Sequence, residues 1–184
     1  MRSLSLLAAG AAVTTSLLAS VSAQVPAPKT VLDAFSLKEA TVQAPTLPRT
    51  AGVSQFEAVV DLGGRRAVLQ LVAHDVRADD FQLLVDDGQT IRALPRPVNT
   101  TYQGTIAGYA DTLVAASLIN GQLYATIRFE GATWGVEPIS SKIVAMPSAA
   151  HVVYRQAAVV VPADVSCGVD TPNTTVAPIS PLNR

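Results

Sequence analysis

Residues 112–129, TLVAASLINGQLYATIRF, carry the clearest fold signal of the chain. Two runs that suit β-strands, 112–119 and 122–129, flank the dipeptide Asn120-Gly121. This dipeptide favours a type I′ turn, because both of its residues accept positive φ and the turn matches the twist of the flanking strands. The stretch therefore predicts a two-stranded β-hairpin.

The same pattern extends in both directions. Towards the N-terminus, Gly63-Gly64 and Asp86-Asp87-Gly88 are turn signals between runs that suit strands, and apolar residues alternate with others along 65–72. No apolar stripe with a helical period longer than about two turns occurs between residues 52 and 155. The further strands are expected at 55–62, 65–72, 81–85, 90–94, 102–106, 132–137 and 151–155. The sequence predicts an all-β, mostly antiparallel meander that forms a sandwich or an open barrel.

Proline-rich segments flank this β-domain, which we expect to span residues 52–161. Residues 24–51 contain four prolines and suit an arm or linker, with one short helix at 31–40. Residues 162–184 contain four more prolines and predict an extended tail without regular structure.

The first 23 residues have the pattern of a secretory signal peptide. Arg2 supplies a positive charge, residues 4–18 are apolar, and Val21-Ser22-Ala23 ends the segment with small residues. Cleavage is expected between Ala23 and Gln24. An uncleaved membrane anchor is the alternative, but the apolar run is interrupted and falls short of the ~20 residues that a spanning helix needs. We expect a secreted or extracytoplasmic protein without a membrane segment after cleavage.

Composition excludes several function classes. The 184 residues include 13 basic and 14 acidic ones, for a net charge of −1 and no run of one sign, which argues against a nucleic-acid partner. One Cys allows no internal disulfide, and two distant His disfavour a zinc site of the chain's own, so no cofactor of its own is expected. The sequence also lacks H-E-x-x-H, G-x-S-x-G and P-loop motifs. A stand-alone enzyme is therefore not expected.

Several polar and aromatic residues are expected to be structural. Each histidine is interpreted as a strand-end or surface residue, the acidic pairs as turn formers, and two aromatic residues as core. A Ca²⁺ site at the acidic pairs is the less simple interpretation. The residues concerned are His74, His151, Asp79, Asp80, Asp86, Asp87, Tyr102 and Trp134.

Cys167 is the residue that most needs a chemical explanation. It lies in the proline-rich tail between Ser166 and Gly168, without the apolar neighbours of a core cysteine. A thiolate is a strong ligand for Zn²⁺, and an adjacent glycine lets the backbone approach a partner's cleft. We therefore expect Cys167 to ligate a metal that another domain or chain supplies. Formation of an intermolecular disulfide is the competing use.

Four blocks of the sequence resemble the propeptides of reprolysin-type (ADAM-like and snake-venom) metalloproteases. TYQGTIAGYAD at 101–111 resembles Y-Q-G-x-V-x-G-x-x-D, and residues 117–123 loosely match S-x-x-x-G-L. WGVEPI at 134–139 is similar to Y-G-I-E-P-L, and HVVYR at 151–155 to H-x-x-Y-R. Order and spacing agree over residues 56–169, which is most of the chain that follows the signal sequence.

The resemblance implies an inhibitory propeptide that also assists folding of the protease. In this family the Cys of a C-G-V motif occupies the fourth position on the catalytic zinc, so Cys167, Gly168 and Val169 would form the switch motif. The partner would be the metalloprotease catalytic domain, in cis or in trans, and the zinc would be that of the protease. The family's additional disulfide is absent, because Thr100 stands at one of its cysteine positions and the Leu118-Ile119 region at the other.

A different class of function remains open from the sequence. An exported β-sandwich without catalytic activity, used for adhesion or ligand binding, would need only the fold. The two hypotheses differ at Cys167, since only the propeptide requires its thiol.

Overall fold

The computed structural model describes residues 24–162, so the expected signal sequence and the tail beyond residue 162 lie outside the described residues. Within this range β-strands are the main regular structure, accompanied by one α-helix and two 3₁₀ turns. The elements are β1 (Val25–Pro26), α1 (Lys29–Phe35), β2 (Thr41–Gln43), β3 (Gln55–Asp61), β4 (Arg66–Ala73), β5 (Leu83–Asp86), β6 (Ile91–Leu94), β7 (Thr101–Ile106), β8 (Tyr109–Ile119), β9 (Gln122–Phe129), β10 (Ala132–Pro138), β11 (His151–Arg155) and the 3₁₀ turns η1 (Ile139–Ser141) and η2 (Gln156–Ala158).

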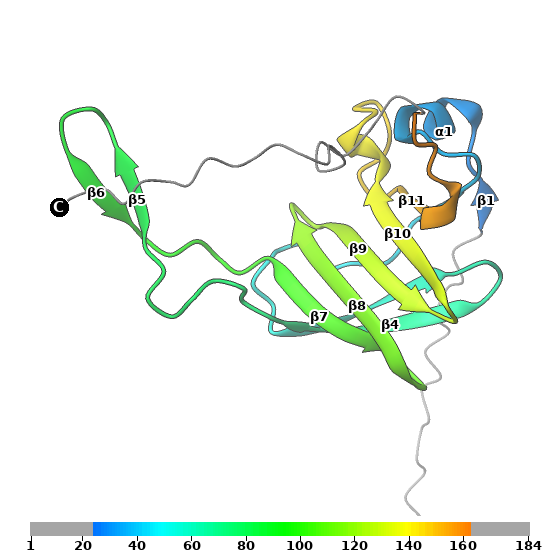
Figure 1. The fold of residues 1–184 in the computed structure, drawn as a ribbon, viewed down its shortest axis with the longest axis horizontal. Helices are drawn as coiled ribbons and strands as arrows, with labels where there is room; N and C mark the ends of the chain where they lie inside the picture. Colours follow the sequence, from blue (N-terminus) through cyan, green and yellow to red (C-terminus); the bar gives the residue numbers. More distant parts are fainter. Residues whose placement is uncertain (1–23, 163–184) are drawn as a thin grey trace, which may run out of the picture.

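Nine strands form one antiparallel sheet in the order β1-β2-β11-β10-β9-β8-β7-β4-β3. From β3 to β11 neighbouring strands follow one another along the chain, with the β5–β6 hairpin inserted between β4 and β7. Figure 1 shows the sheet curled rather than flat, with the β5–β6 hairpin standing away from it. The predicted all-β antiparallel meander is confirmed, in the form of an open barrel.

The hairpin at residues 112–129 forms as predicted. Ile119 pairs with Gln122, and Asn120 and Gly121 take φ values of 52° and 72°. Every second side chain of both strands points into the core, because successive side chains of a strand face opposite sides of the sheet. The buried residues of β8 and β9 are Val114, Ala116, Leu118, Leu123, Ala125, Ile127 and Phe129. They form the centre of the main core, which also contains the predicted core residues Tyr102 and Trp134.

Side chains bridge the two ends of the curled sheet. The Gln43 side chain of β2 donates from Nε2 to the carbonyl of Asp61 in β3, and the Asp61 N–H donates to Gln43 Oε1, both at 2.8 Å. The amide thus takes the place of a neighbouring strand's peptide group. The β3–β4 turn reaches β10, since a β-carbon on Gly63 would lie 3.0 Å from the Trp134 ring. These contacts hold the open barrel curled.

The N-terminal segment differs from the predicted arm or linker. It contributes β1 and β2 to the sheet, and β2 pairs with β11. The helix α1 begins and ends earlier than the predicted 31–40, because Ser36 takes a left-handed conformation (φ 53°) and Leu37 forms a β-bridge with Val159. Val31 and Leu37 are buried in a second apolar cluster with Ile139 and Val152. Packing against these distant residues therefore places the N-terminal segment on the domain. No helix within residues 24–162 is long and apolar enough to cross a membrane.

Candidate functional site

The predicted switch residues Cys167, Gly168 and Val169 lie outside the described residues, as does Ala23. Gln24 is the first described residue and is exposed. The chain just before the predicted tail is tied to the domain. The Val160 N–H donates to the Ser36 carbonyl at 2.7 Å, and the Lys38 N–H donates to the Ala158 carbonyl at 2.8 Å. The C-terminal end of the described range is therefore hydrogen-bonded to the segment that follows α1.

Asp86 and Asp87 accept backbone hydrogen bonds in the turn between β5 and β6, as the sequence predicts for turn formers. Asp87 Oδ1 accepts the backbone N–H groups of Gln89 and Thr90, at 3.0 and 2.9 Å, and Asp86 Oδ1 accepts that of Gly88 at 2.8 Å. The Thr90 N–H bond, followed by that of Gln89, lowers the pKa of Asp87. No group of three His, Cys, Asp or Glu side chains within residues 24–162 is arranged to hold a metal ion.

His151 opens β11, as the sequence predicts for a strand end, but it is fully buried and not a surface residue. Its Nε2 accepts the backbone N–H of Leu123 at 3.1 Å, and its Nδ1 lies 2.8 Å from the Ala149 carbonyl. Because a backbone N–H can only donate, the neutral tautomer with the proton on Nδ1 satisfies both contacts. Burial lowers the pKa of His151, and the Ala149 hydrogen bond opposes this shift. The residue joins the β8–β9 turn region to β11.

Stability is expected to fall in mild acid because of His151. Its pKa in the folded chain lies below 6.5, its ordinary value, so the unfolded chain binds more protons. The free energy of unfolding should be constant just above pH 6.5 and then decrease, by at most about 1.4 kcal/mol per pH unit, until the folded-state pKa is reached. Urea unfolding at a series of pH values measures this slope.

His74→Gln is the matched control for the acid effect, because His74 is exposed just beyond the end of β4. That variant should keep the slope, whereas His151→Gln should remove it from the same pH range. An unchanged slope in His151→Gln would contradict the assignment.

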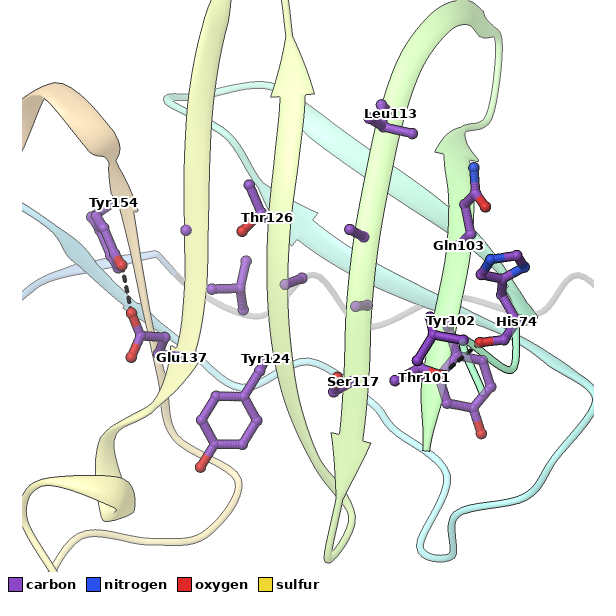
Figure 2. Close-up of a pocket in the computed structure, with 16 residues that line it drawn as sticks. His74, Thr101, Tyr102, Gln103, Leu113, Ser117, Tyr124, Thr126, Glu137 and Tyr154 are labelled. Carbon is purple, nitrogen blue, oxygen red and sulfur yellow. Dashed lines mark hydrogen bonds between the residues drawn. The ribbon is translucent and has the colours of Figure 1, made fainter. Parts of the chain in front are cut away.

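A groove of about 600 Å³ lies on the outer face of the sheet, across β7, β8, β9, β10 and β11 (Figure 2). Its floor carries small side chains, among them Ala115, Ser117, Thr126 and Gly135. In Figure 2, Tyr154 and Glu137 lie at one end and His74 and Gln103 at the other, with Tyr124 and Leu113 between them. The groove is lined mainly by apolar and hydroxyl-bearing groups.

Tyr154 forms one wall of the groove because Gly135 has no side chain. The two residues are paired across β10 and β11, and a β-carbon on Gly135 would lie 2.4 Å from the Tyr154 ring. The Tyr154 hydroxyl donates to Glu137 Oε1 (Figure 2). Burial, together with this hydrogen bond and the negative charge of Glu137, raises the pKa of Tyr154. Glu137 is thus occupied as an acceptor, and the groove suits binding better than proton transfer.

This groove was not predicted from the sequence. Most of its lining residues alternate with the buried residues of the same strands, so they have the composition of an ordinary solvent-facing side. Small residues on adjacent strands become a hollow only when the register places them side by side, as it does for Ala115 and Thr126, or for Gly135 and Thr126.

The chain matches no protein-family model, and no curated protein matches it.

Proposed function

We propose that this chain is the inhibitory and folding-assisting propeptide of a secreted, reprolysin-like zinc metalloprotease. In this proposal the Cys167 thiolate binds the catalytic zinc of the protease domain, at the position that the attacking water needs. The zinc belongs to the protease, and the propeptide supplies one ligand and a folded domain that positions it.

The observation that carries the proposal is that the resembling blocks contact one another in the fold. The blocks at 101–111, 134–139 and 151–155 form β7 with the start of β8, β10 with the start of η1, and β11. Glu137 of the second block accepts the Tyr154 hydroxyl of the third, and His151 of the third accepts the N–H of Leu123 in the loosely matching block.

Two residues of the first block also have specific structural roles. Tyr102 is buried against Phe56, with ring centroids 4.9 Å apart, and a β-carbon on Gly104 would lie 1.9 Å from the Gln70 carbonyl oxygen. Residues that a motif requires together, and that depend on each other's contacts, are the signature of one particular fold. This supports a shared fold with the family that the blocks resemble.

The position of Cys167 suits a ligand that must reach another domain. It follows Val160, the last residue with a backbone hydrogen bond in the described range, by seven positions. An extended chain spans at most about 3.5 Å per residue, so the thiol can reach up to about 25 Å from Val160. A catalytic zinc within that radius of the C-terminal end of the β-domain would be accessible to it.

Cys167→Ser should weaken inhibition of a reprolysin-type catalytic domain by about 100-fold. A zinc site of about four ligands contributes roughly 10–16 kcal/mol, so one thiolate corresponds to a few kcal/mol. The measurement is the inhibition constant of residues 24–184 against the zinc-loaded protease secreted by the same organism, using a fluorogenic peptide. Alkylation of the thiol with iodoacetamide should have the same effect.

Ser166→Ala is the matched control, because it changes a neighbouring side chain of similar size and keeps the thiol. Its inhibition constant should stay within about twofold of the wild-type value. Equal inhibition by the wild-type chain and Cys167→Ser would overturn the zinc-capping role.

The outer-face groove favours one other candidate, an exported binding domain without catalytic activity. An apolar hollow of about 600 Å³ between Tyr154 and Leu113 has the size of a small-ligand site. Under this alternative, Cys167→Ser has no effect on function, whereas Ala115→Trp, which fills the groove from β8, abolishes ligand binding. Loss of protease inhibition in Cys167→Ser but not in Ala115→Trp would decide for the propeptide.

A further inference from the structure

The β5–β6 hairpin buries neither of its faces within residues 24–162. Leu84 and Ile91 lie on one face with fractional exposures of 55% and 68%, and Leu94 on the other is 38% exposed. Figure 1 shows the hairpin standing away from the nine-stranded sheet on two long connections. An isolated two-stranded hairpin is marginally stable in water, and exposed apolar residues gathered on one face mark interaction sites.

A cluster of charged residues holds the base of this hairpin in place. Arg77 donates to Asp75 at 2.7 and 2.9 Å and to the Pro97 carbonyl at 2.7 Å, which joins the two connections. Arg96 donates to Asp75 at 3.2 Å and to the Ala78 carbonyl at 3.1 Å. Since Arg77 and Asp75 precede β5 while Arg96 and Pro97 follow β6, the hairpin leaves the domain in a defined direction.

Phe81 completes the base of the hairpin. The guanidinium groups of Arg77 and Arg96 lie 5.7 and 5.8 Å from its ring centroid. The hydrogen bonds from Arg77 hold the pKa of Asp75 well below its usual range. A hairpin that presents exposed apolar side chains on an ordered base is pre-organised for docking, which lowers the entropy that binding costs.

The charge of the hairpin indicates the chemistry of its partner. The hairpin together with its base, residues 75–97, contains five aspartates and three arginines, a net charge of −2, whereas the whole chain carries −1. Two copies of the hairpin would bring these like charges together, which disfavours pairing with a second copy. A partner with an apolar groove bordered by lysine or arginine side chains complements both features.

We propose that the β5–β6 hairpin is the arm by which this chain docks on the metalloprotease catalytic domain, with Leu84 and Ile91 inserted into an apolar groove bordered by basic side chains. The identity of the partner rests on the proposed function. The hairpin provides a second contact besides Cys167, so the domain stays bound whether or not the thiol is on the zinc.

The test compares binding of hairpin variants of residues 24–184 to the zinc-loaded reprolysin-type catalytic domain. The double variant Leu84→Ser with Ile91→Thr should raise the dissociation constant about tenfold or more, measured by biolayer interferometry. Val144→Ser with Val161→Thr is the matched control, because these valines are also exposed, at 91% and 67%, and lie outside the hairpin. The control should bind within about twofold of wild type.

Two further measurements test the contribution of the hairpin's charge to binding and separate docking by the hairpin from zinc capping by Cys167. Asp79→Lys with Asp80→Lys should lower the association rate constant about tenfold at low salt, because long-range attraction to the basic border is lost. In the Cys167→Ser background the chain should still bind, and the Leu84→Ser/Ile91→Thr pair should then abolish the remaining binding. Circular dichroism checks that each variant is folded.

The outcomes distinguish this inference from the proposed function. If the wild-type chain inhibits through Cys167 but the Leu84→Ser/Ile91→Thr variant has the same dissociation constant as wild type, the proposed docking role of the hairpin is wrong and the propeptide proposal stands. If the wild-type chain neither binds nor inhibits the protease, both proposals are wrong. Self-association of the chain that the hairpin variant abolishes would make a second copy the occupant and overturn the inference.

Discussion

Gly104→Ala should prevent the chain from forming the curled sheet, with a loss of at least about 4 kcal/mol in the free energy of unfolding. Gly104 in β7 pairs with Leu71 in β4, where the two backbones approach closely. A β-carbon at this position would lie 1.9 Å from the Gln70 carbonyl oxygen and 3.2 Å from Leu71 Cα. Because both of these are backbone atoms, no side-chain rotation can make room. Urea unfolding followed by circular dichroism measures the loss.

Gly131→Ala is the matched control for this prediction. Gly131 has a positive φ of 74°, and a β-carbon on it would have no other atom within 4 Å, so the same substitution there adds only backbone strain. That strain costs roughly 1–2 kcal/mol. Equal unfolding midpoints for the two variants would mean that β4 and β7 do not approach as closely as described.

Gln43→Ala should cost about 3 kcal/mol, which is the second-largest effect expected on stability. The Gln43 side chain is buried, and its amide both donates to and accepts from the backbone of Asp61. Truncation would leave the N–H and C=O of Asp61 without these partners and remove the bridge between β2 and β3. Thermal and urea unfolding both measure the loss, and hydrogen exchange should show faster exchange of the Asp61 amide.

Gln70→Ala provides the control for the bridge. Gln70 is exposed on β4, and its side chain donates to Glu57 Oε1 of β3 at 3.1 Å. Its loss should change stability by less than about 0.5 kcal/mol. If Gln43→Ala were as mild as Gln70→Ala, the ends of the sheet would be held by other contacts.

The strands of the meander could be predicted from the sequence because their signals are local. Asn120-Gly121 is a turn on its own, and Ala67, Leu69 and Leu71 alternate with the period of a strand. The prediction was least accurate at the N-terminus. There, four prolines suggested a linker, but Val31 and Leu37 reach an apolar cluster with Ile139 and Val152. Their partners are more than 100 positions away, so no local pattern contains them.

Among the candidate sites, too, some have a local sequence signal and others depend on contacts between distant residues. Cys167 could be singled out from the sequence, because a lone cysteine beside glycine in a proline-rich segment lacks the apolar neighbours of a core cysteine. The groove was not predicted, and for the β5–β6 hairpin the strands and turn were predicted but its exposure was not. Strand register assembles the first from small residues, and the second depends on Leu84 and Ile91 finding no cover within residues 24–162. Exposure of an apolar residue is a property of its neighbours in space.

The sequence alone was enough to predict an antiparallel β-domain and to single out Cys167 as a candidate for chemistry, because turn dipeptides, strand periodicity and residue identity are encoded over a few positions. Only the tertiary structure decided that the sheet curls into an open barrel bridged by Gln43, that His151 is buried, and that the β5–β6 hairpin is left uncovered by the rest of the described chain. These features depend on contacts between residues far apart in the chain, whose energies appear only when the strands are brought together.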